Sequence, residues 1–444
     1  MRGVVIVLGD LVRSPRAVLH ATAMARAGAT VHLVGFAELG WRPFGAPAEL
    51  RVWPLSDRQR GDHAARNRLP YTLTAAWRAF GLLLELLWLV LWRIPRTDVI
   101  LVQNPPGVPT LAVAWLTARI RRSRLVIDWH NLTWAMLTMR VSPRHPLVTA
   151  VSAYERFFGR RADLNLFVSR AMQVTLSQRW GMRGVVFRDR PSQAFQIESE
   201  AERRAIRTRL LERLGEPPGS ALVVSSTSWS ADEDFDLLFE ALTRYDAGSK
   251  DPAYVPQHAG SKDPAYVRQE AHAGSRHPTG AGEGLARLVV LITGQGPLRA
   301  DFEKRCSEAH FRSVGVHTAW LESGEYTRVL AAADLGVCLH RSASGLDLPM
   351  KVLDMFGAGL PVCALDYGPC LAELVQHGIN GLLFRTSDEL AGQLRTTLAT
   401  YPDFSPTVDG LRAGVLQSRV GTWEDSWKNG VWPSLERIAG SQPL

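Results

Sequence analysis

The feature of this sequence that most constrains its fold is a repeated alternation of short apolar runs with helical stretches. In the first half these runs are VVIVLGD, TVHLVGF, DVILVQN, RLVIDWHN, LNLFVS and GVVF. Strands without polar alternation are typical of a parallel sheet that helices cover on both faces. We expect a first helix near Ser14 and Pro15, because Ser is a favoured cap and Pro suits the first helical position.

The same alternation restarts in the second half of the chain. A polar stretch from Arg188 to Pro218 is predicted to connect two domains, and ALVVSSTSW, RLVVLITGQG, GVHTAWL, LGVCLH, LPVCAL and GLLF follow it. A chain of 444 residues has room for two domains of about 200 residues each. The sequence therefore predicts an α/β protein with two doubly wound, Rossmann-like domains, whose crevices at the strand carboxyl ends face one cleft. The expected boundaries are 1–195, 196–405 and 406–444.

Composition restricts the classes of partner. Hydrophobic residues at 46% and charged residues at 21% exclude a disordered chain. The net charge of +8 comes from Arg and suits phosphates or an acidic membrane surface, although a genome that favours Arg explains it equally well. The cysteines Cys306, Cys338, Cys363 and Cys370 lack metal-ligand spacing. We expect core thiols at Cys338 and Cys363, a reducing compartment and no metal site.

One segment has the character of a membrane-associating helix. The N-terminal run MRGVVIVLGD is too short for a signal peptide and is predicted to be the first strand. Leu73–Trp92 is the one long apolar stretch, but Arg78 and Glu85 interrupt it, and its charge-free part is shorter than a membrane span. The tryptophans within it favour a helix in the membrane interface, and a helix packed on a sheet is the alternative.

A short repeat interrupts the second half. AGSKDPAYVPQH begins at Ala247, AGSKDPAYVRQE at Ala259, and a third copy starts at Ala273. This period is shorter than the roughly 20 to 50 residues of packed repeat units. We therefore predict a disordered surface loop over 246–284 with no catalytic part.

The stretch SASGLDLPMKVLDMFGAGLPVCA predicts a strand–turn–helix unit that binds a nucleotide. The helix start would present the amides of Ser344, Gly345 and Leu346 to a diphosphate. Lys351 would add a positive charge, and Asp354 would accept hydrogen bonds from ribose hydroxyls. The alternative is that Lys351 and Asp354 simply reach solvent.

Other loops of both halves add candidate residues. The Gly294-x-Gly296 turn is weak evidence for a ligand by itself. Helix capping explains at least one of the three acids at 232–234. Asp128 and His130 end a strand that faces the cleft, where a carboxylate or imidazole can act as a general base. His130 could equally be a hydrogen-bonded structural residue.

These motifs together resemble the chitobiosyldiphosphodolichol β-mannosyltransferase family. The resemblance rests on LGDLVRSPRAVLHA, LVQNPPGVPTLAV, LVIDWHN, STSWSADEDFDLLFEAL, LITGQGPL, SASGLDLPMKVLDMFGAGLPVCAL, INGLLF and TWEDSWKNGVWP, and runs from Gly3 to about Trp432. It implies a glycosyltransferase-B fold in which the C-terminal half binds GDP-mannose and the N-terminal half binds the acceptor. It also implies inverting transfer to chitobiosyl-diphosphodolichol, forming a β1,4 bond on the cytosolic face of the endoplasmic reticulum.

The resemblance implies a site and an attachment to the membrane. The terminal helix over 423–432 is expected to return to the first domain. Eukaryotic members carry an N-terminal anchor, whereas this sequence starts on a strand, so we expect peripheral or interfacial attachment. The expected donor-binding residues are Ser228, Gly294, Gly296, Ser344, Gly345, Leu346, Lys351 and Asp354. The expected acceptor-binding residues are Gly9, Asp10, Arg13 and Ser14.

A comparison with retaining relatives of this fold suggests the mechanism. Those enzymes carry Glu at the positions of Leu346 and Asp354, and commonly Arg and Lys at the positions of Ser228 and Glu233. A carboxylate beside the leaving group suits single displacement, which needs a base. Glu233, His130 and Asp128 are the candidates, and neither a metal nor a cofactor is required.

Two alternative functions stay open. One is a related enzyme that uses another nucleotide sugar or another polyprenyl-linked acceptor. The other is an inactive, membrane-associated scaffold for a glycosyltransferase complex. For the main hypothesis the expected partners are GDP-mannose, the lipid-diphosphate-linked chitobiose, a membrane surface and other glycosyltransferases of the pathway, and no nucleic acid.

Overall fold

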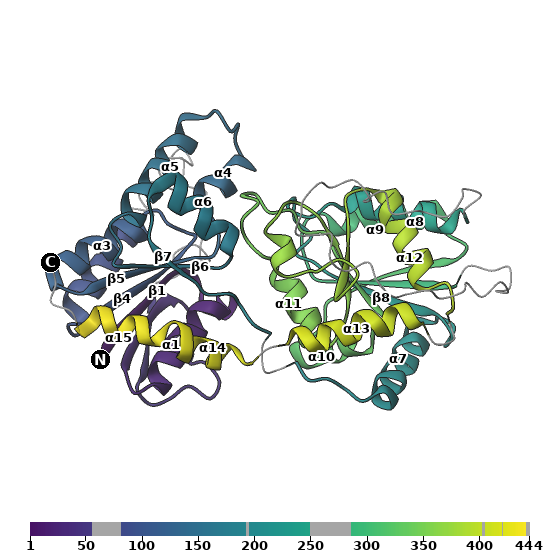
Figure 1. Cartoon of the computed structure of the whole chain (residues 1–444), viewed down its shortest axis with the longest axis horizontal. Coiled ribbons are helices and arrows are strands. Elements are labelled where there is room, and N and C mark those ends of the chain that lie inside the picture. The colour runs from purple at the N-terminus through teal and green to yellow at the C-terminus, as the bar shows by residue number, and fades with distance from the viewer. Residues whose placement is uncertain (56–80, 192–194, 249–285, 402–404, 420, 441–444) are drawn as a thin grey trace, which may run out of the picture.

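The computed structural model describes residues 1–55, 81–191, 195–248, 286–401, 405–419 and 421–440. The predicted repeat loop, from residue 249 on, and residues 73–80 of the predicted apolar helix lie outside this part of the chain. The described residues form two parallel sheets covered by helices, one in each half of the chain (Figure 1). The predicted doubly wound α/β domains are confirmed.

The N-terminal sheet has seven parallel strands in the order β3-β2-β1-β4-β5-β6-β7. Its order reverses between β1 and β4, and ligands bind at such a switch point in doubly wound sheets. The edge strand β3 was not predicted, because its sequence LRVWPL carries Arg and Pro, which an edge position tolerates. The strands are β1 (Arg2–Asp10), β2 (Thr30–Phe36), β3 (Leu50–Leu55), β4 (Val99–Asn104), β5 (Arg124–Trp129), β6 (Leu164–Phe167) and β7 (Gly184–Val186).

Two groups of helices cover this sheet. On one face α1 packs with the C-terminal helices α14 and α15. On the other face, residues 81–88 and the helices η2, α3, α4, α5 and α6 share a second apolar core. The helices are η1 (Leu11–Arg13), α1 (Pro15–Arg26), η2 (Leu89–Arg93), α3 (Thr110–Arg121), α4 (Thr133–Thr138), α5 (Pro146–Gly159) and α6 (Arg170–Trp180). The predicted helix start at Ser14 and Pro15 is confirmed, although the Ser14 side chain makes no capping hydrogen bond.

The described part of the predicted apolar helix combines the two alternatives considered for it. Leu86 and Val90 are buried against the sheet, whereas Trp88 is 53% exposed and Trp92 is 70% exposed. One face of this helix is therefore core and the other is an apolar surface. Among the residues described, no helix is both long and apolar enough to cross a membrane.

The C-terminal sheet has six parallel strands in the order β10-β9-β8-β11-β12-β13. Cys338 and Cys363 are buried in it, as predicted for core thiols. The strands are β8 (Ala221–Ser226), β9 (Leu288–Thr293), β10 (Val314–Ala319), β11 (Leu335–Cys338), β12 (Val362–Leu365) and β13 (Gly381–Phe384). The helices are α7 (Glu200–Leu214), α8 (Phe235–Asp246), α9 (Arg299–Ala309), α10 (Ser323–Ala332), α11 (Met350–Gly357), η3 (Leu371–Glu373), α12 (Ser387–Thr397) and α13 (Pro406–Ser418).

The predicted connection from Arg188 to Pro218 is only in part a linker. Its second half is α7, whose N-terminus has a capping box formed by Ser199 and Glu202. Leu210 and Leu211 anchor this helix in the C-terminal core. The abundance of Arg and Glu on the solvent side of α7 hid this short apolar stripe.

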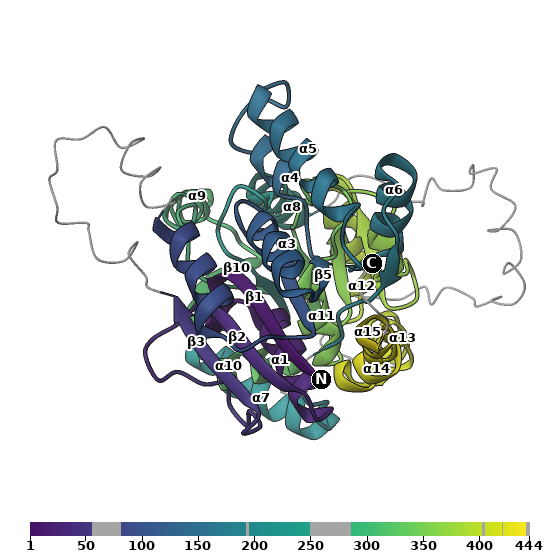
Figure 2. The same cartoon turned by 90° about the vertical axis from the view of Figure 1, so that its left-hand side faces the viewer.

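The C-terminal helices divide between the domains. Arg412 of α13 donates to Gly359 O at 2.8 Å and to Ala333 O at 2.9 Å, which fixes α13 on the C-terminal domain. The chain then crosses back, and α14 (Trp423–Gly430) and α15 (Trp432–Gly440) lie against the N-terminal domain near α1 (Figures 1 and 2). Trp427 Nε1 donates to the buried His20 Nδ1 at 2.9 Å.

Candidate active site

The loops after β8, β9 and β11 form the candidate donor site at the carboxyl ends of the C-terminal strands. The loop after β9 lies so close to the loop after β8 that positions 294 and 296 have no room for a side chain. A Cβ on Gly294 would lie 1.8 Å from Thr227 O, and one on Gly296 would lie 2.0 Å from Ser228 O. Gly294 also has a φ of +124°, which other residues rarely adopt. These glycines are required by loop packing, which brings Ser228 beside the glycine turn.

The loop from 341 to 349 departs from the prediction. Ser344, Gly345 and Leu346 were expected at a helix start, but α11 begins at Met350, after Pro349. The three residues instead form a turn around Asp347, whose Oδ1 accepts from Ser344 Oγ at 3.1 Å. Gly345 has a φ of +68°, and a Cβ there would meet nothing within 4 Å. The turn precedes the helix because the Asp347 carboxylate accepts from the hydroxyls of Ser342 and Ser344, and those hydroxyl oxygens in turn accept from the amides of Gly345 and Leu346.

His340 joins this turn to the loop after β8. Its Nδ1 lies 3.3 Å from Asp232 Oδ2, and its Nε2 lies 3.2 Å from Asp347 Oδ2. Burial alone would lower the pKa of His340, but the two carboxylates outweigh burial and raise the pKa to about 9. His340 was not singled out from the sequence, although it follows a strand as His130 does, and that position was the available signal.

Glu233 and Lys351 contact each other. Lys351 Nζ forms an ion pair with Glu233 Oε1, and the Glu233 side chain is almost fully buried. Glu233 Oε2 also accepts from Thr227 Oγ1 at 2.7 Å and from Ser228 N at 2.9 Å. The residue expected to bind the diphosphate and one candidate base thus neutralise each other in this structure. The neighbouring Asp234 caps α8, as predicted for one of the three acids.

Asp354 lies on the inner side of α11. Tyr326 OH donates to Asp354 Oδ2 at 3.3 Å, and its oxygen lies 3.0 Å from the hydroxyl of Ser226. Burial raises the pKa of Asp354 to about 7, and the bond from Tyr326 opposes this only in part. Asp354 is therefore held at the donor site rather than free in solvent. Tyr326 itself was missed, because nothing in its local sequence marks it.

In the N-terminal domain, Asp128 is fully buried in a cluster of charges. Arg16 binds it with two bonds, from Nε to Oδ2 at 2.7 Å and from Nη2 to Oδ1 at 2.8 Å. Arg16 also pairs with Asp189 of the linker, and His20 Nε2 lies 3.3 Å from Asp128 Oδ2. Burial would raise the pKa of Asp128, but Arg16 and His20 hold it well below its usual range. A carboxylate so placed joins α1, β5 and the linker, and is poorly suited to accept a proton from substrate.

His130 has a different environment, two residues further along. It follows β5 at its carboxyl end, and its backbone N–H donates to Asn104 O at 2.8 Å. The ring is partly exposed. Its Nδ1 is buried and has no hydrogen-bond partner among the described residues, so a substrate proton must go to the other ring nitrogen, Nε2. A partly exposed imidazole at the cleft end of a central strand is suited to proton transfer.

The predicted acceptor residues lie together after β1. Asp10 Oδ1 accepts from Val12 N at 3.0 Å and so caps the short helix η1. Ser14 is buried, and a Cβ on Gly9 would lie 3.2 Å from Ser14 Oγ. The Arg13 side chain is exposed. The structure thus brings these four residues into one turn of the N-terminal domain, and the acceptor role assigned to them stays a prediction.

The two domains touch at the edge of the cleft. Ser169 Oγ donates to Leu346 O of the donor loop at 2.6 Å. Glu373 Oε2 accepts from Arg170 N at 2.8 Å, and Oε1 accepts from Ala171 N at 2.7 Å. A carboxylate of one domain thereby binds the first amides of α6 in the other. Neither Ser169 nor Glu373 was predicted, since such contacts have no local sequence pattern.

No three His, Cys, Asp or Glu side chains within the described ranges are placed to hold a metal ion. The expectation that catalysis needs no metal stays a prediction. In this structure Lys351 is paired with Glu233, the Gly345 amide donates to Ser342 Oγ at 2.8 Å, and the Leu346 amide donates to Ser344 Oγ at 3.2 Å.

Comparison with known proteins agrees with this geometry. Residues 282–400 match the family of group 1 glycosyl transferases. Among solved structures, HepE of Anabaena in complex with UDP and glucose has a TM-score of 0.62 at 15% identity, covering 98% of this chain and 100% of its own. Sucrose-phosphate synthase of Thermosynechococcus elongatus has a TM-score of 0.63 at 15% identity, covering 99% of both chains. These similarities support the predicted glycosyltransferase-B fold.

Sequence relatives cover nearly the whole chain. The chitobiosyldiphosphodolichol β-mannosyltransferase of Mus musculus is 37% identical over 97% of this chain and 88% of its own length. The human protein of that name is 36% identical over 97% of this chain and 91% of its own length. A UDP-glycosyltransferase of Arabidopsis thaliana, TURAN, is 35% identical over 98% of this chain and 97% of its own length. The chain is a glycosyltransferase and belongs to the chitobiosyldiphosphodolichol β-mannosyltransferase family.

Proposed function

We propose that this enzyme transfers mannose from GDP-mannose to a lipid-linked chitobiosyl diphosphate, with inversion and formation of a β1,4 bond. The observation that carries this proposal is the identity of 36–37% to β-mannosyltransferases over 97% of the chain. The donor loops add support, because Ser228 and Glu233 occupy the positions where retaining relatives commonly place two cations, and Glu233 is paired with Lys351.

His130 acts as the general base in this proposal. It accepts the proton of the acceptor hydroxyl as that oxygen attacks C1 of mannose. The bond from C1 to the diphosphate breaks in the same step, and its electron pair leaves with GDP. His130 is preferred over Asp128 because Arg16 holds that carboxylate with two bonds. It is preferred over Glu233 because Thr227 Oγ1 and Ser228 N hold Glu233 Oε2, and these bonds do not depend on Lys351. General-base assistance of this kind contributes roughly 100- to 10,000-fold.

Lys351 changes partner when the donor binds. In this structure its ammonium group is paired with Glu233. A donor diphosphate carries more charge than one carboxylate and therefore draws Lys351 away from Glu233. The amides of Ser344 to Leu346 also turn to the diphosphate. Asp354 then accepts hydrogen bonds from the ribose. No metal or cofactor is required, because the cation and the amides stabilise the charge that develops on GDP.

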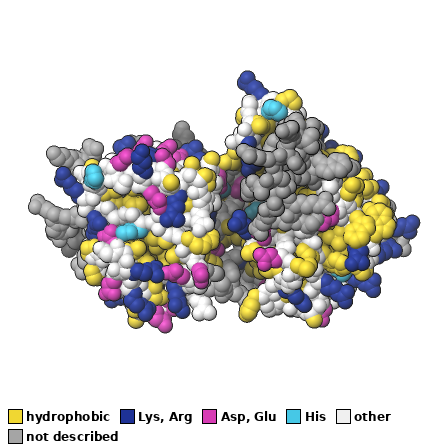
Figure 3. Space-filling view, turned by 180° about the vertical axis from the view of Figure 1, so that it is seen from behind, with side chains coloured by type: hydrophobic (Ala, Val, Ile, Leu, Met, Phe, Trp, Pro, Cys, Tyr) yellow, Lys and Arg dark blue, Asp and Glu magenta, His cyan; other side chains and the backbone are white. Residues whose placement is uncertain are grey.

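The enzyme works at a membrane surface, the cytosolic face of the endoplasmic reticulum, as a peripheral protein. Hydrophobic side chains gather on the N-terminal domain, at the right of Figure 3, with Lys and Arg side chains beside them. Exposed apolar residues on the face made by residues 81–88, η2 and α3 are Leu84, Trp88, Trp92, Leu116 and Ile120. Arg93 lies over the Trp88 ring at 5.7 Å, which keeps a cation beside this apolar face. Tryptophan and Arg together favour an interface with anionic lipid.

The experiment that tests the proposal supplies GDP-mannose, labelled in the sugar, and phytanyl-diphospho-chitobiose. Label that enters the lipid phase supports both donor and acceptor. Labelled UDP-glucose and UDP-N-acetylglucosamine serve as controls, since one relative is named a UDP-glycosyltransferase. Transfer from a UDP-sugar in place of GDP-mannose would show that the proposed donor is wrong. If the protein neither transferred sugar nor bound GDP, the inactive scaffold would be favoured.

A further inference from the structure

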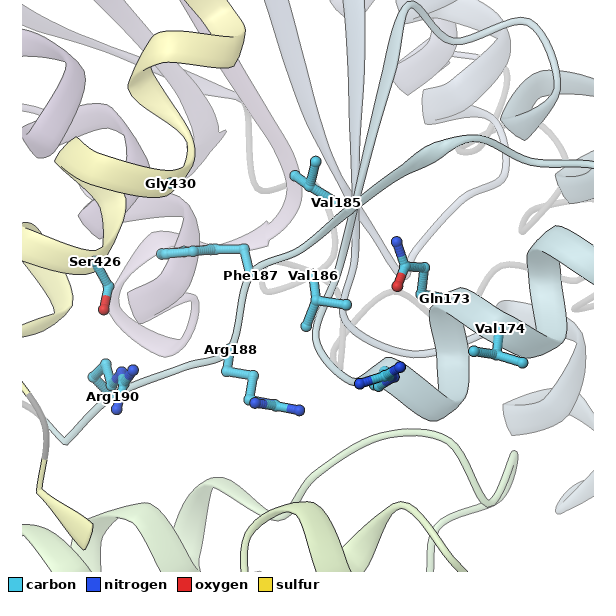
Figure 4. A pocket seen from close by; sticks show the side chains of 10 residues that line it. Gln173, Val174, Val185, Val186, Phe187, Arg188, Arg190, Ser426 and Gly430 are labelled. Atoms are coloured by element: carbon cyan, nitrogen blue, oxygen red, sulfur yellow. The ribbon is translucent and has the colours of Figure 1, made fainter. Parts of the chain in front are cut away.

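A cavity of about 630 Å³ lies where the N-terminal domain meets the linker. Figure 4 shows α14 on one side of it and α6, with Gln173 and Val174, on the other. Arg188 and Arg190 stand on the segment that leaves β7, and Arg170 at the start of α6 completes the basic lining. None of these three arginine side chains took part in the site derived above.

The charges at this cavity are not balanced. Arg188 pairs with Glu373 at 2.6 Å. Arg190 is partly exposed, and its Nε has no hydrogen-bond partner among the described residues. Burial together with the charge of Arg188 lowers the pKa of Arg190. The Arg170 side chain has no ion pair with any residue that the structure describes. Within the described residues three cations thus face one carboxylate, and this excess of positive charge favours an anionic ligand.

The cavity adjoins the cleft. Arg170 directly follows Ser169, whose Oγ donates to Leu346 O of the donor turn at 2.6 Å. The lining also has an apolar part, formed by Val185, Val186 and Phe187, which precede Arg188 on the same segment (Figure 4). A ligand here would combine a strongly charged group with an apolar neighbour and lie beside the donor.

We propose that this cavity binds a diphosphate group, that of the lipid-linked acceptor, through Arg170 and Arg190, an inference that rests on the proposed function. A diphosphate diester carries two negative charges, which match the two arginines that Glu373 does not neutralise. Arginine is suited to this ligand because its planar fork donates two parallel hydrogen bonds to phosphate oxygens. The apolar wall contacts the first carbons of the lipid.

The test uses the full-length variants Arg170→Gln and Arg190→Gln. Each removes one charge-assisted phosphate contact and raises the KM for phytanyl-diphospho-chitobiose about tenfold or more, with the KM for GDP-mannose unchanged. The exposed Arg183, at the other end of β7, supplies the matched control Arg183→Gln, which leaves both KM values unchanged. An unchanged acceptor KM in both variants, an equal rise in the control, or loss of GDP binding would overturn the proposal.

A binding experiment separates this inference from the transfer reaction itself. Phytanyl diphosphate in detergent micelles is titrated into wild type and the two variants, with phytanyl monophosphate and inorganic diphosphate as further arms. Weaker binding of phytanyl diphosphate by the variants supports the inference even where no mannose is transferred. If wild type bound inorganic diphosphate as tightly as phytanyl diphosphate, the site would be one for free diphosphate and the lipid assignment would be wrong. Equal binding of phytanyl diphosphate by wild type and both variants would show that the cavity is not its binding site.

Discussion

The three side chains considered as catalytic base differ in what already holds them. Asp128 is bound by Arg16, and Glu233 is bound by Lys351, Thr227 and Ser228, whereas the His130 ring is partly exposed. The sequence placed Asp128 and His130 at a strand end and Glu233 at a helix start, but could not rank them. Arg16 lies 112 residues from Asp128, and Lys351 lies 118 residues from Glu233, so only the folded structure shows which carboxylates are held.

Replacement of His130 tests this ranking. We expect His130→Ala to lower kcat by roughly 100- to 10,000-fold, which is about 3 to 5 kcal/mol in the barrier. The KM for GDP-mannose should stay unchanged, because the donor site lies in the other domain. Steady-state kinetics measure both. Turnover above a tenth of wild type would show that His130 is not the base.

Asp128→Asn provides the contrasting case. Loss of the Asp128 carboxylate charge leaves Arg16 buried with a weakened partner. Thermal unfolding should therefore occur at a lower temperature, and the free energy of unfolding should fall by about 3 to 5 kcal/mol. The folded fraction should retain turnover within a factor of about ten, since no proton passes through Asp128. A stable variant with abolished turnover would contradict the structural role.

Among the elements, the turn between β11 and α11 is where prediction from sequence was least complete. The residue types for a nucleotide site were recognisable, and so were the strand before the turn and the helix after it. The helix start was misplaced because Asp347, His340 and Asp232 hold the turn through side-chain contacts across two loops. Local propensity does not contain contacts of that kind. The apolar stripe of α7 was missed for a different reason, the abundance of Arg and Glu on its solvent side.

This turn should make donor binding sensitive to alkaline pH. The pKa of His340, near 6.5 in an unfolded chain, is raised to about 9, so the stabilisation by its charge is present below about pH 6.5 and is lost as pH rises through about 9. We expect the Kd for GDP to increase above pH 9 in wild type. In His340→Asn the binding of GDP should be weaker at pH 7, and its Kd should change little with pH. Calorimetric titration at pH 7 and pH 9.5 measures this, and a wild-type Kd that does not vary would contradict it.

At the scale of the whole molecule, the two domains and their strands other than β3 were predictable from the apolar pattern, but the contacts between the domains were not. Glu373 binds the amides of Arg170 and Ala171 and the side chain of Arg188, all in the opposite half of the chain. The return of α14 and α15 to the N-terminal domain adds a second connection. The cleft is thus fixed by a few long-range polar contacts at its edge.

Removal of the Glu373 carboxylate should loosen this arrangement. In Glu373→Ala the start of α6 loses its acceptor, a change worth about 1 kcal/mol, and the exposed pair with Arg188 adds little. Small-angle scattering should show a larger radius of gyration without donor. Glu308→Ala, which removes an exposed charge of α9, is the control. Equal radii for Glu373→Ala and wild type would show that other contacts hold the domains.

The central claim, inverting mannose transfer, is tested most directly by the anomeric configuration of the product. The enzyme is incubated with labelled GDP-mannose and phytanyl-diphospho-chitobiose, and the extracted glycolipid is digested with β-mannosidase or α-mannosidase. We predict that β-mannosidase releases the label and that α-mannosidase does not. Release by α-mannosidase alone would mean retention of configuration, and would contradict both the single displacement and the base assigned to it.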